Sequence, residues 1–336
     1  MIETGDDGAI FCVAFHSDGM QLSSGKDDGV RRWRVADGQE VGNRFTKDVY
    51  AISASRDGRW IVCGTREGAS VWDAKSQEKV IEVEGTDYVG AVDISPESTR
   101  FATGAGLGDR KASIWNIITG ERLVGPLRHD GYIAEMKFSP NGEHIATADR
   151  GHSIRVFDSH NGDQLIAIET DTPTWSPITP LAWSNNGERI FAVSSDRKIR
   201  SFDVSTGSQL AESQVLSISE VVSIALAANG KFLATFADHS ITFWDTSTLT
   251  QIGPVIEDSQ RIRSIALSPD SSYLATGGWD GNITIRNLNN ILPDLFGPFR
   301  VSTHAFTILS DKSHIVFPLL KSLRHLAMAV IMTYSR

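Results

Sequence analysis

Seven copies of one strand–turn pattern, a regular repeat length and a period-two alternation of apolar side chains predict an all-β fold: a seven-bladed β-propeller of four-stranded antiparallel blades. The clearest copy is LATGGWDGNITIRNL, Leu274 to Leu288. Successive copies are separated by 39, 43, 42, 45, 42 and 42 residues at the aromatic position or its equivalent. That position falls at Trp33, Trp72, Trp115, Phe157, Phe202, Trp244 and Arg286.

Each repeat begins with an alternating run that ends in a turn, as in CVAFHSDG, EMKFSPNG and IALSPDS. Asp-Gly, Asn-Gly and Ser-Pro are turn signals, since Gly and Asn tolerate positive φ and Pro presets its own φ. Two further strands and a weaker fourth follow. Gly-Pro pairs at 125–126, 253–254 and 297–298 mark the fourth strand as an edge strand, because Pro lacks the N–H that a central strand donates. Such a unit cannot bury its own faces, so the copies must stack radially.

The propeller is expected to span residues 1–299, followed over 300–336 by a degenerate start of an eighth repeat and a short apolar and basic tail. Only MIETGDDG precedes the first inner strand, which is too short to cross a blade. We therefore expect atypical ring closure, with Ile291 to Phe299 as the outer strand of the seventh blade. The near-repeat after residue 300 suggests a piece of a longer repeat array or of a larger multidomain chain, or else an end that departs from the ancestral reading frame.

Composition argues against several partner classes. The formal net charge of -9 disfavours nucleic acid, because phosphate binding needs a concentrated positive field. The one basic cluster, Arg31, Arg32 and Arg34, is interpreted as a solvated strand. There is no secretory signal and no apolar run near 18 residues, so we expect an intracellular protein, in the cytoplasm or nucleus, without a membrane partner. Cys12 and Cys63 indicate no disulfide framework.

The sequence gives little indication of an enzyme active site or a cofactor site. GAGLGD (104–109) lacks the helix and Lys-Ser/Thr pair of a phosphate loop and is interpreted as an enlarged turn. His144, His152 and His160 fall at opposite ends of one predicted blade, so they do not converge on a metal. Nucleophile-elbow, zincin and Cys-x-x-Cys motifs are missing. We expect no catalytic residue, no cofactor and no metal.

The repeat resembles that of the WD40 (WD-repeat) family, whose Trp-Asp pair ends the third strand. Trp72-Asp73 and Trp244-Asp245 match this pair, whereas Trp279-Asp280 does not, because Asp280 matches the turn Asp that precedes the third strand. Only His129 matches the His that the family links to a hydroxyl, an Asp and the Trp. Without a full set in any blade, we expect a ring held mainly by apolar packing. The aromatic residues of the third strands are expected in the core.

The resemblance implies a binding face around the central channel, formed by the loops that lead into first strands and by the turns between second and third strands. Tyr, Trp and Arg are typical anchors of interfaces. Trp279 is expected to point outward. The predicted partner-binding residues are Asp27, Asp48, Tyr50, Arg66, Tyr88, Tyr132, Arg150, Trp175, Arg261, Arg263 and Trp279, with Ser195 and Glu220 as further residues of this face.

These features predict a non-enzymatic interaction scaffold or sensor that binds a protein or peptide. Its Gly-Pro outer strands and incomplete His, hydroxyl, Asp and Trp sets resemble those of repeat arrays attached to large fungal signalling NTPases, which are thought to act as sensors. One alternative is a substrate receptor of a cullin-RING ubiquitin ligase, since VCGTREGASVWDAK (62–75) resembles an adaptor-docking box, although Lys75 replaces its Arg. A second alternative is a propeller enzyme with a metal bound in the channel.

Overall fold

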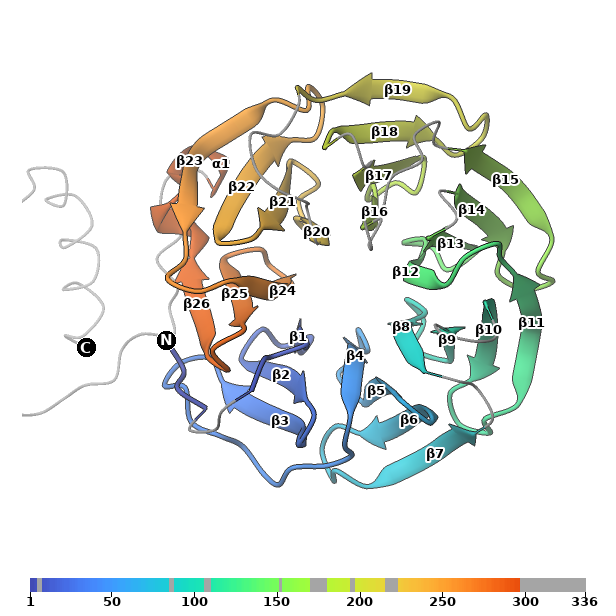
Figure 1. Ribbon diagram of the computed structural model, residues 1–336, viewed down its shortest axis with the longest axis horizontal. Helices are drawn as coiled ribbons and strands as arrows, with labels where there is room; N and C mark the ends of the chain where they lie inside the picture. The colour runs from blue at the N-terminus through green and yellow to red at the C-terminus, as the bar shows by residue number, and fades with distance from the viewer. Residues whose placement is uncertain are drawn as a thin grey trace, which may run out of the picture. The chain divides into compact units, whose positions relative to one another are not determined.

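Seven antiparallel sheets stand around a central axis and form a closed ring (Figure 1), which confirms the predicted seven-bladed β-propeller. The computed structural model describes residues 1–4, 8–84, 88–105, 110–150, 153–169, 180–193, 197–214 and 223–296. Residues Met1–Phe296 form one compact unit. Over the described residues, five sheets have four strands and the first and last have three.

Consecutive strands pair in chain order within each blade, with the first strand of each blade facing the axis (Figure 1). The first three blades contain β1 (Cys12–Phe15), β2 (Gln21–Lys26), β3 (Gly29–Arg34); β4 (Val49–Ala54), β5 (Trp60–Thr65), β6 (Gly68–Asp73), β7 (Lys79–Glu84); β8 (Val89–Ile94), β9 (Arg100–Ala105), β10 (Lys111–Asn116), β11 (Arg122–Arg128).

The fourth to seventh blades contain β12 (Ile133–Phe138), β13 (His144–Asp149), β14 (Ser153–Asp158), β15 (Gln164–Glu169); β16 (Leu181–Trp183), β17 (Arg189–Val193), β18 (Ile199–Asp203), β19 (Gln209–Glu212); β20 (Ser223–Leu226), β21 (Phe232–Ala237), β22 (Ser240–Asp245), β23 (Gln251–Glu257); β24 (Ile262–Leu267), β25 (Tyr273–Gly278), β26 (Ile283–Asn287). Pro126 and Pro254 lie in the outermost strands β11 and β23, as the missing N–H requires.

One hydrogen bond sets the same register in all seven blades. The backbone N–H of the residue that opens the first turn donates to the carbonyl five residues later, at 2.8–3.0 Å. We call these the register residues: His16, Ser55, Ser95, Ser139, Ser184, Ala227 and Ser268. In the five blades where this residue is Ser, its Oγ also accepts the N–H of the residue five positions on. The turn chemistry read from the sequence therefore fixes equivalent positions from blade to blade.

In five blades the third strand ends in an Asp or Asn that is a turn residue. Its side-chain oxygen accepts backbone N–H groups two and three residues ahead, as at Asp73, where Lys75 and Ser76 donate at 2.9 and 2.8 Å. The same pair of bonds occurs at Asn116, Asp158, Asp203 and Asp245. The Asp of the Trp-Asp pair thus stabilises the turn into the fourth strand.

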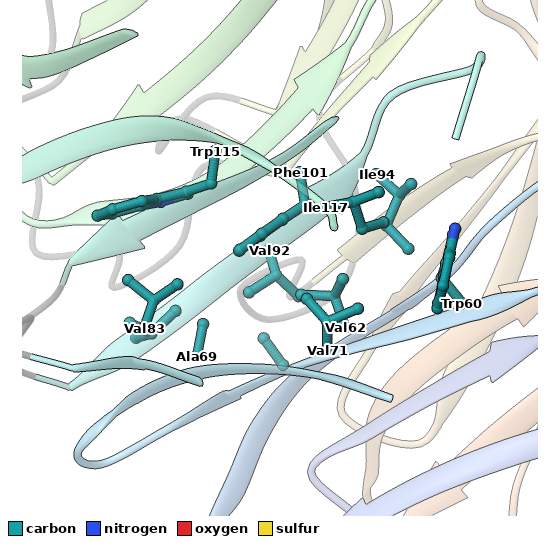
Figure 2. Packing of buried hydrophobic residues seen from close by; sticks show 12 residues of the cluster. Trp60, Val62, Ala69, Val71, Val83, Val92, Ile94, Phe101, Trp115 and Ile117 are labelled. Atoms are coloured by element: carbon teal, nitrogen blue, oxygen red, sulfur yellow. The ribbon is translucent and has the colours of Figure 1, made fainter. Parts of the chain in front are cut away.

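Apolar packing joins every blade to the next. The buried hydrophobic residues of the described chain form seven clusters, one at each of the seven blade–blade boundaries. Figure 2 shows the cluster between the second and third blades, where Val62 and Val71 face Val92 and Phe101. Trp72 is partly buried, and the other third-strand aromatic residues are buried in the core as expected.

Hydrogen bonds to the third-strand tryptophan support this packing in three blades. Nε1–H donates to a hydroxyl of the second strand, from Trp33 to Ser24, Trp115 to Thr103 and Trp244 to Thr235, at 2.8–2.9 Å. In the fourth blade the buried His129 is hydrogen-bonded through Nε2 to Thr147 Oγ1 at 2.8 Å.

The seventh blade replaces this set with an ion pair. Arg286, at the tryptophan position, donates through Nη2 to Asp258 Oδ2 at 2.8 Å and through Nη1 to Thr276 Oγ1 at 3.1 Å. Thr276 in turn donates to Asp258 at 3.2 Å. Asp258 and His129 both precede their register residues by ten positions, so a carboxylate here takes the place of the imidazole.

Ring closure corrects the sequence prediction. Ile2 and Ile283 exchange both backbone hydrogen bonds, at 2.7 and 3.1 Å, so the N-terminal residues do pair with β26. Residues Leu288–Asn290 form the 3-10 helix η1 and Pro293–Phe296 form the short helix α1, so the predicted outer strand is wrong over 291–296, while 297–299 lie outside the described residues. Leu292 and Phe296 pack on the cluster between the sixth and seventh blades instead.

The first blade contradicts two further expectations. It has no fourth strand among the described residues, since Trp33–Glu40 and Val30–Phe45 form only isolated bridges. Arg31 and Arg32, interpreted as solvated, are only 5% and 6% exposed. Arg31 donates to Glu40 and to the Thr4 carbonyl at 2.9 and 2.7 Å, and Arg32 donates to the Ala74 carbonyl. The returning segment and the N-terminus cover this strand, a long-range effect that alternation does not reveal.

Candidate functional site: the mouth of the central channel

A central cavity of about 620 Å³ is lined by first strands of the ring. Phe11, Tyr50 and Arg263 line it and lie at the starts of β1, β4 and β24, each five residues before its register residue. Arg56 and Pro140, which follow the ends of first strands, line the cavity as well. The first three side chains therefore share one end of the channel, which we call the mouth.

Five side chains from four blades form a continuous run at the mouth, and we call this run the mouth cluster. It consists of Tyr88, Tyr50, Phe11, Arg263 and Trp279. Ring centroids are 4.7 Å apart for Tyr88 and Tyr50 and 5.3 Å apart for Tyr50 and Phe11. Cζ of Arg263 lies 4.2 Å from the ring centroid of Phe11 and 4.8 Å from that of Trp279.

Local backbone features set the two ends of the run. Trp279 follows β25, and its N–H donates to the Arg261 carbonyl at 3.0 Å, so the turn is tied to the loop that leads into β24. Its side chain is 50% exposed, as a residue pointing outward from a tight turn should be. Tyr88 lies over Gly90, where a Cβ would come within 2.8 Å of Tyr88 Cε1. Glycine at this position makes room for the ring.

Burial shifts the pKa of two groups at the mouth. Burial raises the pKa of the Tyr88 hydroxyl, Tyr50 adds to this effect, and the positive charges of Arg263 and Arg150 oppose it. Burial also lowers the pKa of the Arg263 guanidinium. Both shifts follow from partial removal of polar groups from water.

The other predicted residues lie around the mouth cluster. Arg150 stacks over Tyr132, with Cζ 4.8 Å from the ring centroid. Arg261 lies 5.9 Å from the Trp279 centroid and pairs with Asp238 through Nε at 2.6 Å.

Three predicted residues make fewer side-chain contacts. Asp48 donates its backbone N–H to the Asp27 carbonyl at 3.0 Å, and both side chains are exposed. Arg66 is exposed in the turn between β5 and β6. Trp175, Ser195 and Glu220 lie outside the described residues, as do 106–109, His152 and everything after residue 296.

Sequence reasoning missed Phe11 and Asp238. Phe11 precedes His16 by the five residues that separate Tyr50 from Ser55 and Arg263 from Ser268, so the repeat register contained its signal. Asp238 follows β21 in a turn, with a φ of 53°, and its ion pair with Arg261 is what assigns it to the mouth.

Deeper in the channel lies a small charged group. Lys137 Nζ is 3.4 Å from Glu135 Oε1 and 3.6 Å from Asp93 Oδ1, and Asp93 Oδ2 accepts the Phe138 N–H at 2.8 Å. Enclosure raises the pKa of Glu135. Burial alone would lower the pKa of Lys137, but the two carboxylates outweigh it and raise that pKa.

Neither a metal centre nor a membrane-spanning helix emerges from the described ranges. Within them, no group of three or more His, Cys, Asp or Glu side chains is placed to hold a metal ion. No helix in that part of the chain has the length and apolar character needed to cross a bilayer.

A seven-bladed ring with turn-capping Asp residues and Trp–hydroxyl bonds is a β-propeller, here with an aromatic and cationic channel mouth. The family model for the WD domain, G-beta repeat, matches residues 2–34, 77–116, 122–158 and 249–287. Together with the relatives below, this match supports the WD40 repeat family for the chain.

Three relatives illustrate the similarity. The autophagy-related protein 16 of Arabidopsis thaliana is 24% identical over 284 residues, covering 82% of this chain and 46% of the relative. The nuclear distribution protein nudF of Aspergillus niger is 25% identical over 191 residues, 48% of this chain and 42% of the relative. A guanine nucleotide-binding protein subunit beta of Oryza sativa subsp. japonica is 26% identical over 197 residues, with coverage of 57% and 41%. The chain spans less than half the length of each.

Proposed function

We propose that the chain is a non-enzymatic interaction scaffold that binds a protein or peptide on the face around the channel mouth. The observation that carries this proposal is the mouth cluster, in which four aromatic rings from four blades form a run beside the cavity, with the guanidinium of Arg263 between the rings of Phe11 and Trp279. Its outermost ring, Trp279, is half exposed. Aromatic and Arg side chains dominate the energetic centres of protein interfaces, and this cluster concentrates them.

The contribution of one anchor can be estimated. A Trp side chain buries up to about 250 Å², so covering the exposed half of Trp279 would remove about 100 Å² from water. At about 25 cal/mol per Å² this contributes about 2.5 kcal/mol to binding, before the costs of association. The tyrosines at the same face add to this.

The proposed contact residues are the predicted set, extended by Phe11. The names of the relatives are consistent with a regulatory or assembly role, since one is a subunit of a guanine nucleotide-binding protein. That the chain acts as a sensor array beside a signalling NTPase stays a prediction, as does adaptor docking through residues 62–75. A transcript encoding this propeller and an NTPase domain in one frame would support the first.

The test is a paired affinity capture with mass spectrometry. Wild-type chain is compared with a Tyr88→Ala, Tyr132→Ala, Trp279→Ala variant. A control variant, Leu123→Ala, Leu165→Ala, Leu210→Ala, removes three exposed apolar side chains from the outer strands β11, β15 and β19 instead. Unchanged circular dichroism and similar Tm are required of both.

We expect partners captured by the wild type and the control variant to be lost from the mouth variant. In a titration with such a partner, a loss of at least about 2.5 kcal/mol corresponds to an affinity at least about sixtyfold weaker. Equal capture by all three proteins would place the binding surface elsewhere and refute the proposal.

A further inference from the structure

Arg263 is the residue at the mouth whose charge the scaffold role leaves unexplained. Its guanidinium lies between the rings of Phe11 and Trp279, with Cζ at 4.2 and 4.8 Å from their centroids. No carboxylate of the described residues lies within 4.0 Å of its nitrogens. The side chain is half-buried and lines the channel cavity. Its donors are therefore held in a fixed plane without an acidic partner from the part of the chain that the structure describes.

Comparable arginines elsewhere in the chain are paired. Arg261, two residues earlier on the same rim, forms its ion pair with Asp238 at 2.6 Å. The partly buried Arg286 pairs with Asp258 at 2.8 Å, with Thr276 as a second acceptor. Holding a guanidinium away from water without a counter-charge costs free energy, and an incoming anion recovers it.

The surrounding charges restrict where an anion can bind. Burial keeps the Tyr88 hydroxyl and the Cys12 thiol uncharged at neutral pH, and the more distant carboxylate of Asp27 is a negative charge that acts on Arg263. Further along the channel, Lys137 is already paired with Asp93 and Glu135. An acidic group is therefore attracted to Arg263 at the mouth and not to Lys137.

We propose that the mouth cluster recognises an acidic peptide segment, whose Asp or Glu carboxylate accepts both donors of the Arg263 fork. An apolar side chain beside that carboxylate packs against Trp279 and the tyrosine rings. This inference rests on the proposed function and names the chemistry of the partner. Arg forks match carboxylates bidentately, and stacking between two rings fixes the plane before binding.

The net charge of -9 explains why a peptide and not a nucleic acid suits this mouth. A polyanion would be repelled by the net negative charge of the molecule, whereas a single carboxylate can pair with the guanidinium of Arg263. The aromatic rings then provide the apolar contact area that a single ion pair lacks.

The experiment is selection of a displayed random peptide library against the intact chain. The proteins compared are the wild type, Arg263→Gln, Arg263→Lys, Arg128→Gln and the triple mouth variant, all checked by circular dichroism and Tm. Arg128→Gln is the matched control, since it removes the same charge from an exposed position of the outer strand β11. We expect peptides with Asp or Glu next to an apolar residue to be enriched by the wild type and by Arg128→Gln, and not by Arg263→Gln.

A double-mutant cycle makes the contact specific. The best peptide is compared with its amide analogue, Glu→Gln or Asp→Asn, by titration. Arg263→Gln and the amide analogue should each weaken binding at least about tenfold, and the two together should weaken it little further. Arg263→Lys keeps the charge without the fork and should lie between wild type and Arg263→Gln.

The outcomes separate this inference from the proposed function. Two results would overturn the acidic-peptide proposal and leave the mouth as the binding face. One is selected peptides that need Tyr88, Tyr132 and Trp279 but show no acidic preference. The other is a double-mutant cycle in which the affinity losses from Arg263→Gln and from the amide analogue multiply. Binding that survives the triple mouth variant would overturn both. A selection that yields no binder of the wild type also counts against both.

Discussion

Removing one partner of the Arg286–Asp258 pair should destabilise the propeller much more than removing both. The two side chains are only 16% and 11% exposed, and Nη2 and Oδ2 are 2.8 Å apart. At an effective dielectric constant of about 20, charges at that distance attract by about 6 kcal/mol, which their burial largely offsets. Breaking a fully buried pair costs about 3–5 kcal/mol.

Because both side chains keep some exposure, we take the lower end of that range. Arg286→Leu should lower the free energy of unfolding by about 3 kcal/mol, since Asp258 is left charged and without its main partner. Asp258→Leu should cost a similar amount. The double variant should lose about 1 kcal/mol, because two apolar side chains of similar volume leave no buried charge.

The assay is urea unfolding followed by circular dichroism, with Tm as a second measure. For a unit of this size, 3 kcal/mol corresponds to a fall in Tm of about 6 °C. Arg34→Leu is the control, since its pair with Asp37 is exposed on both sides and should contribute less than about 1 kcal/mol. Additive costs in the double variant, or single variants within about 0.5 kcal/mol of wild type, would refute this account of the seventh blade.

Three further predictions follow from the ring and its turns. Phe101→Ala should cost about 3–5 kcal/mol in urea unfolding, because Phe101 is fully buried between the second and third blades, whereas the half-exposed Ile118→Ala should change little. Ile2→Asp should lower Tm and speed proteolysis near β26 by burying an unpaired charge at the closure; equal proteolysis of both proteins would contradict the role of this bridge. Hydrogen bonds from Ser76, His160, Ser205 and Ser247 lower the pKa of Asp73, Asp158, Asp203 and Asp245. Their contribution is therefore present above the unfolded pKa near 3.8 and lost as pH falls through the folded pKa, so the fourfold Asp→Asn variant, built like Asn116, should lose less stability below pH about 4 than wild type.

The sequence predicted those parts of the fold that depend on local chemistry. Alternation, turn residues and the repeat length are readable because each blade repeats the same short-range rules. The seven register residues illustrate this, since a Ser hydroxyl and its turn lie within five positions of one another.

Long-range contacts explain the errors. The burial of Arg31 depends on Glu40 and on the Thr4 carbonyl, and neither contact follows from the pattern of β3. Closure through Ile2 joins residues 281 positions apart with a single bridge, too short to leave a strand signal. The pair of Arg286 with Asp258 replaces the expected tryptophan set, and only the side-chain geometry reveals it.

Differences between repeats at one register position explain why the mouth has a chemistry of its own. Every blade needs the same turn, but the residue five positions before it is free of that demand, and it lines the channel in the five blades where the structure describes it. In the seventh, first and second blades it is Arg263, Phe11 and Tyr50, which contact in series. In the third blade it is Gly90, over which Tyr88 folds to continue the run, and in the fourth it is the small Ala134. Among these described positions, the large side chains lie on three adjacent blades. A symmetric ring would present the same group from every blade, whereas this arc offers a guanidinium among aromatic rings, which suits a short asymmetric ligand such as a peptide.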